Sequence, residues 1–182
     1  MSRREQDAQL DAAFTDFVAA RRRALFGTAY LLTGGDRERA EDIVQSTLVK
    51  LYVRWRRLHG RVDIGAYARR AIINTHIDHA RQRWHREVPG LDLIDQPAEP
   101  EPASEDNDEL WAALRRLSPK QRRVVILRHY WGLSVQEVAD DLGVSTGTVK
   151  SQTSAALSIL RGVLLLDDSP SPGTGRPGDP RD

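Results

Sequence analysis

The stretch LSVQEVADDLGVSTGTVKSQTSAALSILR, residues 133–161, decides the fold of this chain. Ser134 followed by Glu137 three residues later is the pattern of a capping box, which marks the start of a helix. Gly143 stands where a helix ends most easily, because glycine adopts the left-handed conformation at little cost. Apolar residues at helical spacing between these two signals predict one buried face: Val135, Val138, Ala139 and Leu142.

A second helix is predicted to follow the turn at Gly143. Ser145 is in position to cap it, and Val149 and Leu157 are expected to face inward. The small side chain of Ala139 lets two helices cross closely, as in a helix-turn-helix unit. Hydroxyl, amide and cationic side chains, which contact base edges and phosphates, then remain on the exposed start of the second helix. The predicted DNA-contacting residues are Thr146, Thr148, Lys150, Ser151 and Gln152.

The composition excludes several classes of protein. The 182 residues include no cysteine, which rules out disulfides and thiolate metal sites. No apolar run approaches the roughly 20 residues that cross a bilayer, and the N-terminal stretch lacks the apolar core of a signal peptide. We therefore expect a cytoplasmic protein without a membrane segment. Because no phosphate loop, nucleophile elbow or zinc-type cluster occurs, we expect neither an enzyme nor a cofactor or metal site.

The net charge of +1 conceals a strong pattern along the chain. Residues 1–88 carry a net charge of +6, residues 89–109 carry −8 and residues 110–166 carry +5. Two basic segments joined by an acidic one fit a protein whose two ends meet phosphate backbones, while the segment between them is repelled.

Helical periodicity continues through the rest of the chain, so we predict an all-α fold. Three N-terminal helices, at about residues 10–32, 36–57 and 64–86, are expected to bury one shared core. Ser118-Pro119 starts a helix before the helix-turn-helix in a second small domain. The predicted division is residues 10–88 and 109–166 for the two helical domains, 89–108 for a disordered, acidic, proline-rich linker, and 167–182 for a disordered tail.

Three motifs in this order resemble the sigma-70 family of bacterial transcription initiation factors, in particular its small extracytoplasmic-function group and the actinobacterial SigE-like subfamily. The motifs are AEDIVQSTLVKLYVRW at 40–55, AYARRAIINTHIDHARQRW at 66–84 and LSPKQRRVVILRHYWGLSVQEVADDLGVSTGTVKSQTSAAL at 117–157. The resemblance covers about residues 10–162. It implies a sigma factor that is monomeric when free, binds core RNA polymerase and directs transcription from promoter DNA. The resemblance also allows for an anti-sigma factor as a binding partner.

The resemblance also assigns roles to individual residues. In the family, the second helix of the first domain docks on the largest polymerase subunit, and the third helix with its preceding loop reads the −10 element as single-stranded DNA. The helix-turn-helix reads the −35 element, and the helix before it contacts phosphate. The polymerase-binding positions are Asp42, Gln45, Lys50 and Arg54; the −10 positions are His59, Arg61, Arg70, Asn74, Asp78 and Arg81; the phosphate positions are Arg122 and Arg123.

One departure from the family concerns the third helix. Principal sigma factors carry an aromatic cluster there to stack melted bases, whereas this chain is expected to present Ile72, Ile73 and Thr75 on that face. The departure predicts weaker promoter melting. His76 and His79, three residues apart on the same helix, are expected to face nucleic acid or solvent and not a metal.

Two alternatives to a sigma factor remain open from the residues alone. A helix-turn-helix regulator would bind duplex operator DNA as a dimer, without being a polymerase subunit. An adaptor would bind polymerase without conferring promoter choice. The genes controlled, the promoter consensus, the inducing signal, the existence of an anti-sigma factor and the role of the tail do not follow from the sequence.

Overall fold

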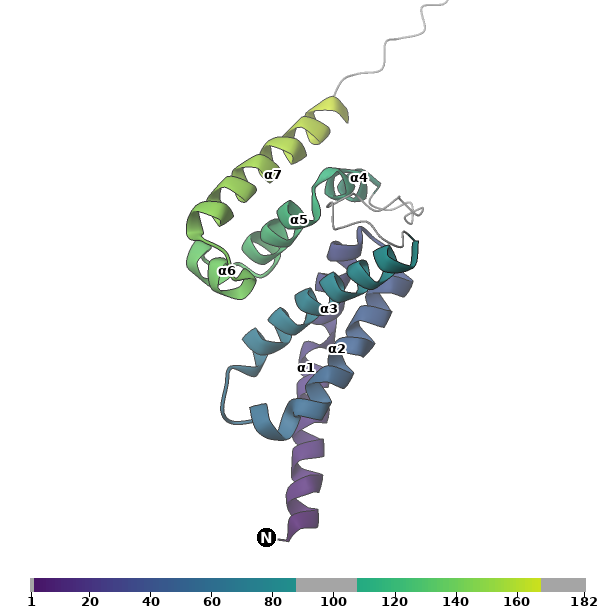
Figure 1. The fold of residues 1–182 in the computed structure, drawn as a ribbon, viewed down its shortest axis with the longest axis vertical. Helices are drawn as coiled ribbons and strands as arrows, with labels where there is room; N and C mark the ends of the chain where they lie inside the picture. The colour runs from purple at the N-terminus through teal and green to yellow at the C-terminus, as the bar shows by residue number, and fades with distance from the viewer. Residues whose placement is uncertain (1, 88–107, 168–182) are drawn as a thin grey trace, which may run out of the picture.

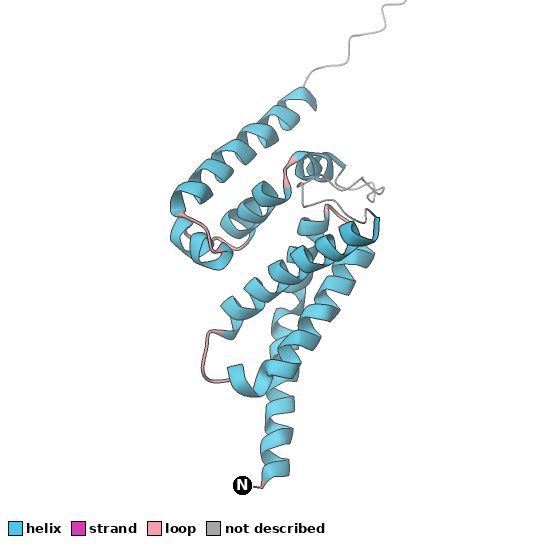
Figure 2. Ribbon diagram, viewed as in Figure 1, coloured by secondary structure: helices cyan, strands magenta, loops and turns pink. Residues whose placement is uncertain are grey.

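The computed structural model describes residues 2–87 and 108–167, and every regular element in these two ranges is a helix. The all-α prediction is confirmed. The predictions of an acidic linker and a C-terminal tail fall almost entirely on residues outside the described ranges. Figures 1 and 2 show two groups of helices that lie against each other. We call α1–α3 the first domain and α4–α7 the second domain.

The first domain contains three long helices, α1 (Arg3–Thr33), α2 (Arg37–Leu58) and α3 (Ile64–Glu87). Gly34 ends α1 in the left-handed conformation, at φ +74°. The side chain of Asp36 accepts a hydrogen bond from the backbone of Arg39 and so caps α2. These two local signals turn the chain tightly, so that α1 and α2 pack side by side (Figure 1).

Helix α1 begins at Arg3, about two turns earlier than the sequence analysis predicted. Ser2 and Glu5 form a capping box there, the same device that starts the helix after Ser134. The added turns are fixed to α2, because Arg56 forms an ion pair with Asp7 and, just beyond them, the indole N–H of Trp55 donates to the carbonyl of Leu10 at 2.9 Å. The ring of Trp55 also lies edge-on to Phe14, with 5.1 Å between the ring centroids.

The second domain contains α4 (Asp108–Arg116), α5 (Pro119–Val125), the π-helical turn η2 (Ile126–Tyr130), α6 (Val135–Leu142) and α7 (Thr146–Asp167). The predicted helix-turn-helix is confirmed: Ser134 and Glu137 form the capping box of α6, and Gly143 ends it at φ +66°. Val149 is fully buried, as predicted. On the next turns Ala156 takes the buried position, and Leu157, which was expected there, is only half-buried.

The two domains share one apolar core. Buried residues of the first domain, such as Leu25 and Ile72, belong to the same cluster as Leu127 and Val138 of the second. Ile72, Ile73 and Thr75 are all nearly inaccessible to solvent. They form part of the interior of the molecule, so the prediction that they lie on the surface offered to melted DNA is wrong.

Polar contacts also join the domains. The indole N–H of Trp131 donates to the hydroxyl of Thr28 at 2.9 Å, and a guanidinium N–H of Arg122 donates to the carbonyl of Leu32 at 3.0 Å. Tyr30 lies edge-on to Trp111, with 4.8 Å between the ring centroids. All three contacts are made by the C-terminal half of α1, which therefore serves as the common support of both domains.

Candidate nucleic-acid interface

The start of α7 presents the polar side chains that the sequence analysis assigned to DNA. Ser145 caps the helix by accepting a hydrogen bond from the backbone of Thr148 at 3.1 Å. Thr148, Lys150 and Ser151 are exposed. Thr146 and Gln152 are half-buried. Because Val149 anchors this turn in the core, the exposed side chains are held on a rigid helix.

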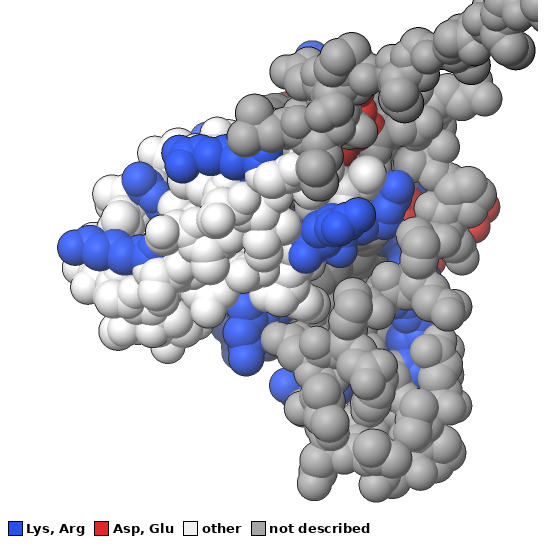
Figure 3. All heavy atoms as spheres, turned by 90° about the horizontal axis from the view of Figure 1, so that it is seen from above, with Lys and Arg blue, Asp and Glu red and all other residues white. Residues whose placement is uncertain are grey.

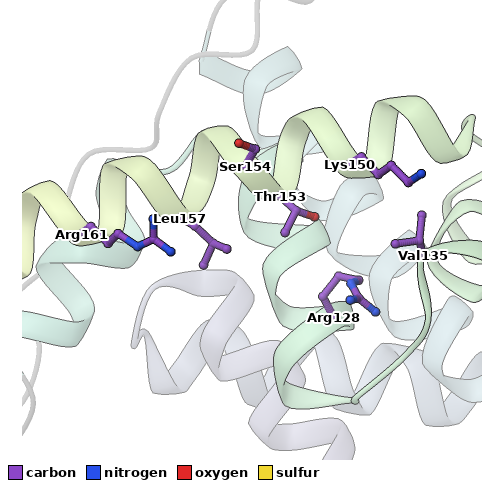
Figure 4. Close-up of a pocket in the computed structure, with 7 residues that line it drawn as sticks. All are labelled: Arg128, Val135, Lys150, Thr153, Ser154, Leu157 and Arg161. Atoms are coloured by element: carbon purple, nitrogen blue, oxygen red, sulfur yellow. The ribbon is translucent and has the colours of Figure 1, made fainter.

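An open groove of about 320 Å³ runs along α7 beside this surface. Its cationic side chains are Lys150 and Arg161 of α7 and Arg128 of η2, and its lining contains no acidic residue (Figure 4). Hydroxyl groups of Thr153 and Ser154 lie between them. Phosphate oxygens accept hydrogen bonds from all of these groups. The sequence analysis missed Arg128 and Arg161, although Arg161 follows Lys150 by eleven residues, a spacing that keeps both on one helix face.

Arg122 is directed into the molecule, not toward solvent. Its guanidinium donates to the carbonyl groups of Leu114 and Leu32, at 2.9 and 3.0 Å. Burial and the nearby guanidinium of Arg115 lower the pKa of Arg122 to about 10. In this arrangement Arg122 is engaged with backbone carbonyls and is not presented to phosphate, contrary to the expectation from sequence. The neighbouring Arg123 is half-buried, close enough to lower the pKa of His76.

The predicted −10 residues lie on α3 and on the loop before it. Arg70, Asn74 and Arg81 are exposed on α3, as their spacing predicted. Asp78 is half-buried and pairs with Lys50 at 3.0 Å. Through this pair the carboxylate of Asp78 holds the side chain of Lys50 against α3.

The loop residues His59 and Arg61 are also exposed. The ring of His59 stacks on Trp55, with 5.1 Å between the ring centroids. The stack fixes the start of the loop to the aromatic cluster of α1 and α2.

The four predicted polymerase-binding residues of α2 separate into two faces. Asp42 and Gln45 are exposed on the outer face. Lys50 instead turns toward α3, where its ammonium group donates to Thr75 and Asp78, and Arg54 donates to the hydroxyl of Tyr67 at 2.9 Å.

The outer face of α2 continues with apolar side chains that the sequence analysis did not name. Val49, Tyr52 and Val53 are 63%, 51% and 77% exposed. Together with Asp42 and Gln45 they follow helical spacing, and we call these five residues the outer stripe of α2. The sequence does contain a signal for these residues. Val49, Tyr52 and Val53 are apolar but do not share the helical spacing of the buried residues Val44, Leu51 and Trp55.

His76 lies between the domains and not on the surface. Burial lowers its pKa to about 4, and the positive charges of Arg123, Arg122, His79 and Arg39 act in the same direction. The expectation that His76 faces nucleic acid or solvent is therefore wrong.

The view in Figure 3 shows that Lys and Arg side chains outnumber Asp and Glu side chains on the described part of this face. A basic surface attracts the phosphate backbone at long range. In the described ranges no helix is both long and apolar enough to cross a bilayer.

Comparisons with known proteins agree with this geometry. Residues 17–86 match the family model Sigma-70 region 2, and residues 107–160 match the model Sigma-70, region 4. The chain is 38% identical to the RNA polymerase sigma-E factor of Streptomyces coelicolor, over 85% of this chain and 88% of that protein. It is 35% identical to the ECF RNA polymerase sigma factor SigL of Mycobacterium tuberculosis, over 85% of this chain and 89% of that protein.

Two solved structures have the same fold as this chain. The sigma factor RpoE of Bartonella quintana, crystallised with the anti-sigma factor NepR, superposes with a TM-score of 0.68 at 26% identity, over 85% of this chain and 98% of that chain. CnrH, in complex with the cytosolic domain of CnrY, superposes with a TM-score of 0.62 at 24% identity, over 89% of this chain and 96% of that chain.

Both conserved regions occur here in family order, and nearly the whole length of the sigma-E relative is matched. The chain therefore belongs to the sigma-70 family, in its extracytoplasmic-function group, and is a sigma factor that directs promoter-specific transcription initiation.

Proposed function

We propose that this sigma factor binds core RNA polymerase through the outer stripe of α2. Val49 and Val53 are exposed on a helix whose opposite face is packed, and beside them lies the half-exposed ring of Tyr52, whose hydroxyl donates to Asp11 of α1. Exposed apolar side chains flanked by polar ones are typical of a protein interface. Asp42 and Gln45 supply the polar part of the contact, whereas Lys50 and Arg54 act by fixing α2 to α3.

The second part of the proposal concerns promoter DNA. Thr146, Thr148, Lys150, Ser151 and Gln152 read the −35 element in the major groove, because they stand at the start of a rigid recognition helix. The −10 element meets Arg70, Asn74 and Arg81 of α3, with His59 and Arg61 on the preceding loop. The groove of Arg128, Lys150 and Arg161 holds the DNA backbone beside the −35 element.

We assign polymerase and −10 binding to residues 10–88, and −35 binding to residues 109–166. The protein acts as a monomer in the cytoplasm and contributes binding and not chemistry of its own. An anti-sigma factor is a further proposed partner, because the RpoE relative that superposes over both domains was crystallised with one.

The observation that carries the proposal is the pairing of an outer stripe on α2 with a polar recognition helix on α7, in a chain that matches sigma factors over both regions. In vitro transcription tests it. Purified protein and core polymerase, supplied with a library of genomic promoters, are expected to give run-off transcripts that neither gives alone. A protein that ignores core polymerase and forms a symmetric dimer on duplex operator DNA would support the regulator alternative instead.

A further inference from the structure

Asp141 of α6 lies in the interface between the domains and contacts two arginines of α3. Its Oδ2 is 2.6 Å from Nε of Arg69, and its Oδ1 is 3.8 Å from Nη1 of Arg70. The side chain of Asp141 is 5% exposed, that of Arg69 is 12% exposed and that of Arg70 is 44% exposed. The carboxylate of the second domain thus bridges two adjacent cations of the first.

Arg69 is held in place from a second side. Its guanidinium lies over the ring of Trp131, 5.4 Å from the ring centroid. Trp131 is fixed in turn by its hydrogen bond to Thr28. A planar guanidinium in a fixed position, with a second arginine beside it, is an arrangement that binds carboxylate and phosphate oxygens alike.

We propose that Arg69 and Arg70 form a phosphate-binding pair for the −10 strand, and that Asp141 occupies this pair in place of phosphate when the two domains are closed on each other. The inference rests on the proposed function, because Arg70 belongs to the −10 surface. It adds Arg69, which sequence reasoning did not assign, and it gives Asp141 the role of an internal competitor of DNA.

The rest of the interface explains why this contact can be released. Nδ1 of His76 and Nη1 of Arg115 are buried without a hydrogen-bond partner among the described residues. The guanidinium of Arg122 donates to the neutral carbonyl groups of Leu114, Leu32 and Leu117. Buried donors without acceptors and buried cations without anions both disfavour the state that contains them. The ion pairs of Asp141 therefore act as a latch on an interface whose other polar contacts, made by Trp131 and Arg122, go to neutral groups.

Closure lowers the affinity of the free protein for single-stranded DNA. A molecule whose binding-competent state is populated only in part has its apparent affinity reduced by that fraction. Docking on polymerase and engagement of both promoter elements favour separated domains, in which Arg69 and Arg70 exchange a carboxylate for phosphate. The free factor is then poor at binding DNA, and the polymerase-bound factor is not.

The first experiment uses the full chain with single cysteines at Asp16 and Ser158, two exposed positions in a chain that has no cysteine of its own. Fluorescence energy transfer between labels at these sites reports domain separation. Binding of a labelled mixed-sequence single-stranded oligonucleotide reports access to the arginines. Asp141→Asn is expected to lower the energy transfer and raise the affinity about tenfold. Asp140→Asn, a change at the exposed neighbouring carboxylate, is expected to alter neither.

Two outcomes would overturn the proposal. Unchanged energy transfer in Asp141→Asn would show that Asp141 does not hold the domains together. Lowered energy transfer without a gain in DNA affinity would show that Arg69 and Arg70 do not bind phosphate. A circular dichroism melt that matches the parent protein ensures that α6 is intact.

A double variant separates the two roles of Arg69. Arg69→Ala/Asp141→Asn is expected to keep the low energy transfer of Asp141→Asn but to lose its gain in DNA affinity. An equal gain in DNA affinity in the single and double variants would overturn the assignment of Arg69 to phosphate. Run-off transcription with core polymerase reports the proposed function separately: its loss in the parent protein contradicts that function, whereas the energy-transfer result still decides the latch.

Discussion

The indole N–H of Trp131 donates a hydrogen bond of 2.9 Å to the hydroxyl of Thr28, and this bond fastens the second domain to α1. Thr28 is fully buried and donates its own hydroxyl proton to the carbonyl of Ala24 at 2.8 Å. The hydroxyl therefore both donates and accepts, which leaves a buried acceptor site if the indole is removed.

Trp131→Phe is expected to weaken the closed arrangement by about 1 kcal/mol, because the hydroxyl of Thr28 loses its donor. The measurement is the energy transfer between the two labelled domains during a urea titration. His129→Asn serves as the control, because His129 is exposed on the helical turn that precedes Trp131. Equal effects of the two variants would contradict the importance of the indole.

Val53→Asp is expected to reduce the affinity for core polymerase about tenfold or more, because it places a charge at the centre of an apolar contact. Val53 is 77% exposed, so the folded protein tolerates the change. Lys50→Ala is expected to change the affinity by about twofold at most, since Lys50 makes an exposed ion pair with Asp78. Titration of labelled protein with core enzyme measures both. A larger loss of polymerase affinity in Lys50→Ala than in Val53→Asp would show that Lys50 itself contacts polymerase.

Lys150→Ala and Arg161→Ala are each expected to reduce the salt dependence of duplex DNA binding, because each removes one phosphate contact from the groove on α7. The slope of log K against log salt concentration should fall by about one unit for each variant, and by about two for the pair. Arg116→Ala, an exposed change on α4, should leave the slope unaltered. An unchanged slope in Arg161→Ala would remove that residue from the phosphate contacts.

Acidification is expected to destabilise the closed protein through His76. Its pKa is lowered to about 4 in the folded chain, against about 6.5 in an unfolded one. The unfolded chain therefore binds a proton more readily, and stability is lost as the pH falls from about 6.5 toward 4. The full difference corresponds to about 3 kcal/mol.

The measurement is the free energy of unfolding at pH 7 and pH 5, compared between the parent protein and His76→Gln. The groups that face His76, namely Arg39, His79, Arg122 and Arg123, are unchanged in the variant. A parent protein that loses no more stability than His76→Gln over this range would show that His76 is not the group responsible.

Local signals in the sequence predicted local structure well. Ser134 with Glu137, Gly143 and Ser118-Pro119 each act within one turn of helix, and each forms the cap that was expected. The start of α1 at Arg3 was within reach of the same rule, since Ser2 and Glu5 have the spacing of a capping box. The sequence contains no comparable signal for the π-helical turn η2, because Ile126–Tyr130 continues the apolar pattern of α5.

Contacts between distant parts of the chain were not predictable in the same way. Helical spacing shows which residues share a face but not which neighbouring helix covers that face. Lys50 and Arg54 were therefore assigned to polymerase binding, although their side chains donate hydrogen bonds to Asp78 and Tyr67 of α3. Arg122 was assigned to phosphate because its partner, the carbonyl of Leu32, lies 90 residues away. Asp141 and Arg69 are separated by 72 residues, and neither was assigned a role.

The edge-on contact between Tyr30 and Trp111 has a consequence for the life of the molecule away from its partners. When the domains part, both aromatic rings lose their cover and meet water together. Exposed aromatic rings favour contact with other apolar surfaces, so the open molecule is expected to self-associate more readily than the closed one. Packing of the two domains against each other therefore also favours a monodisperse protein.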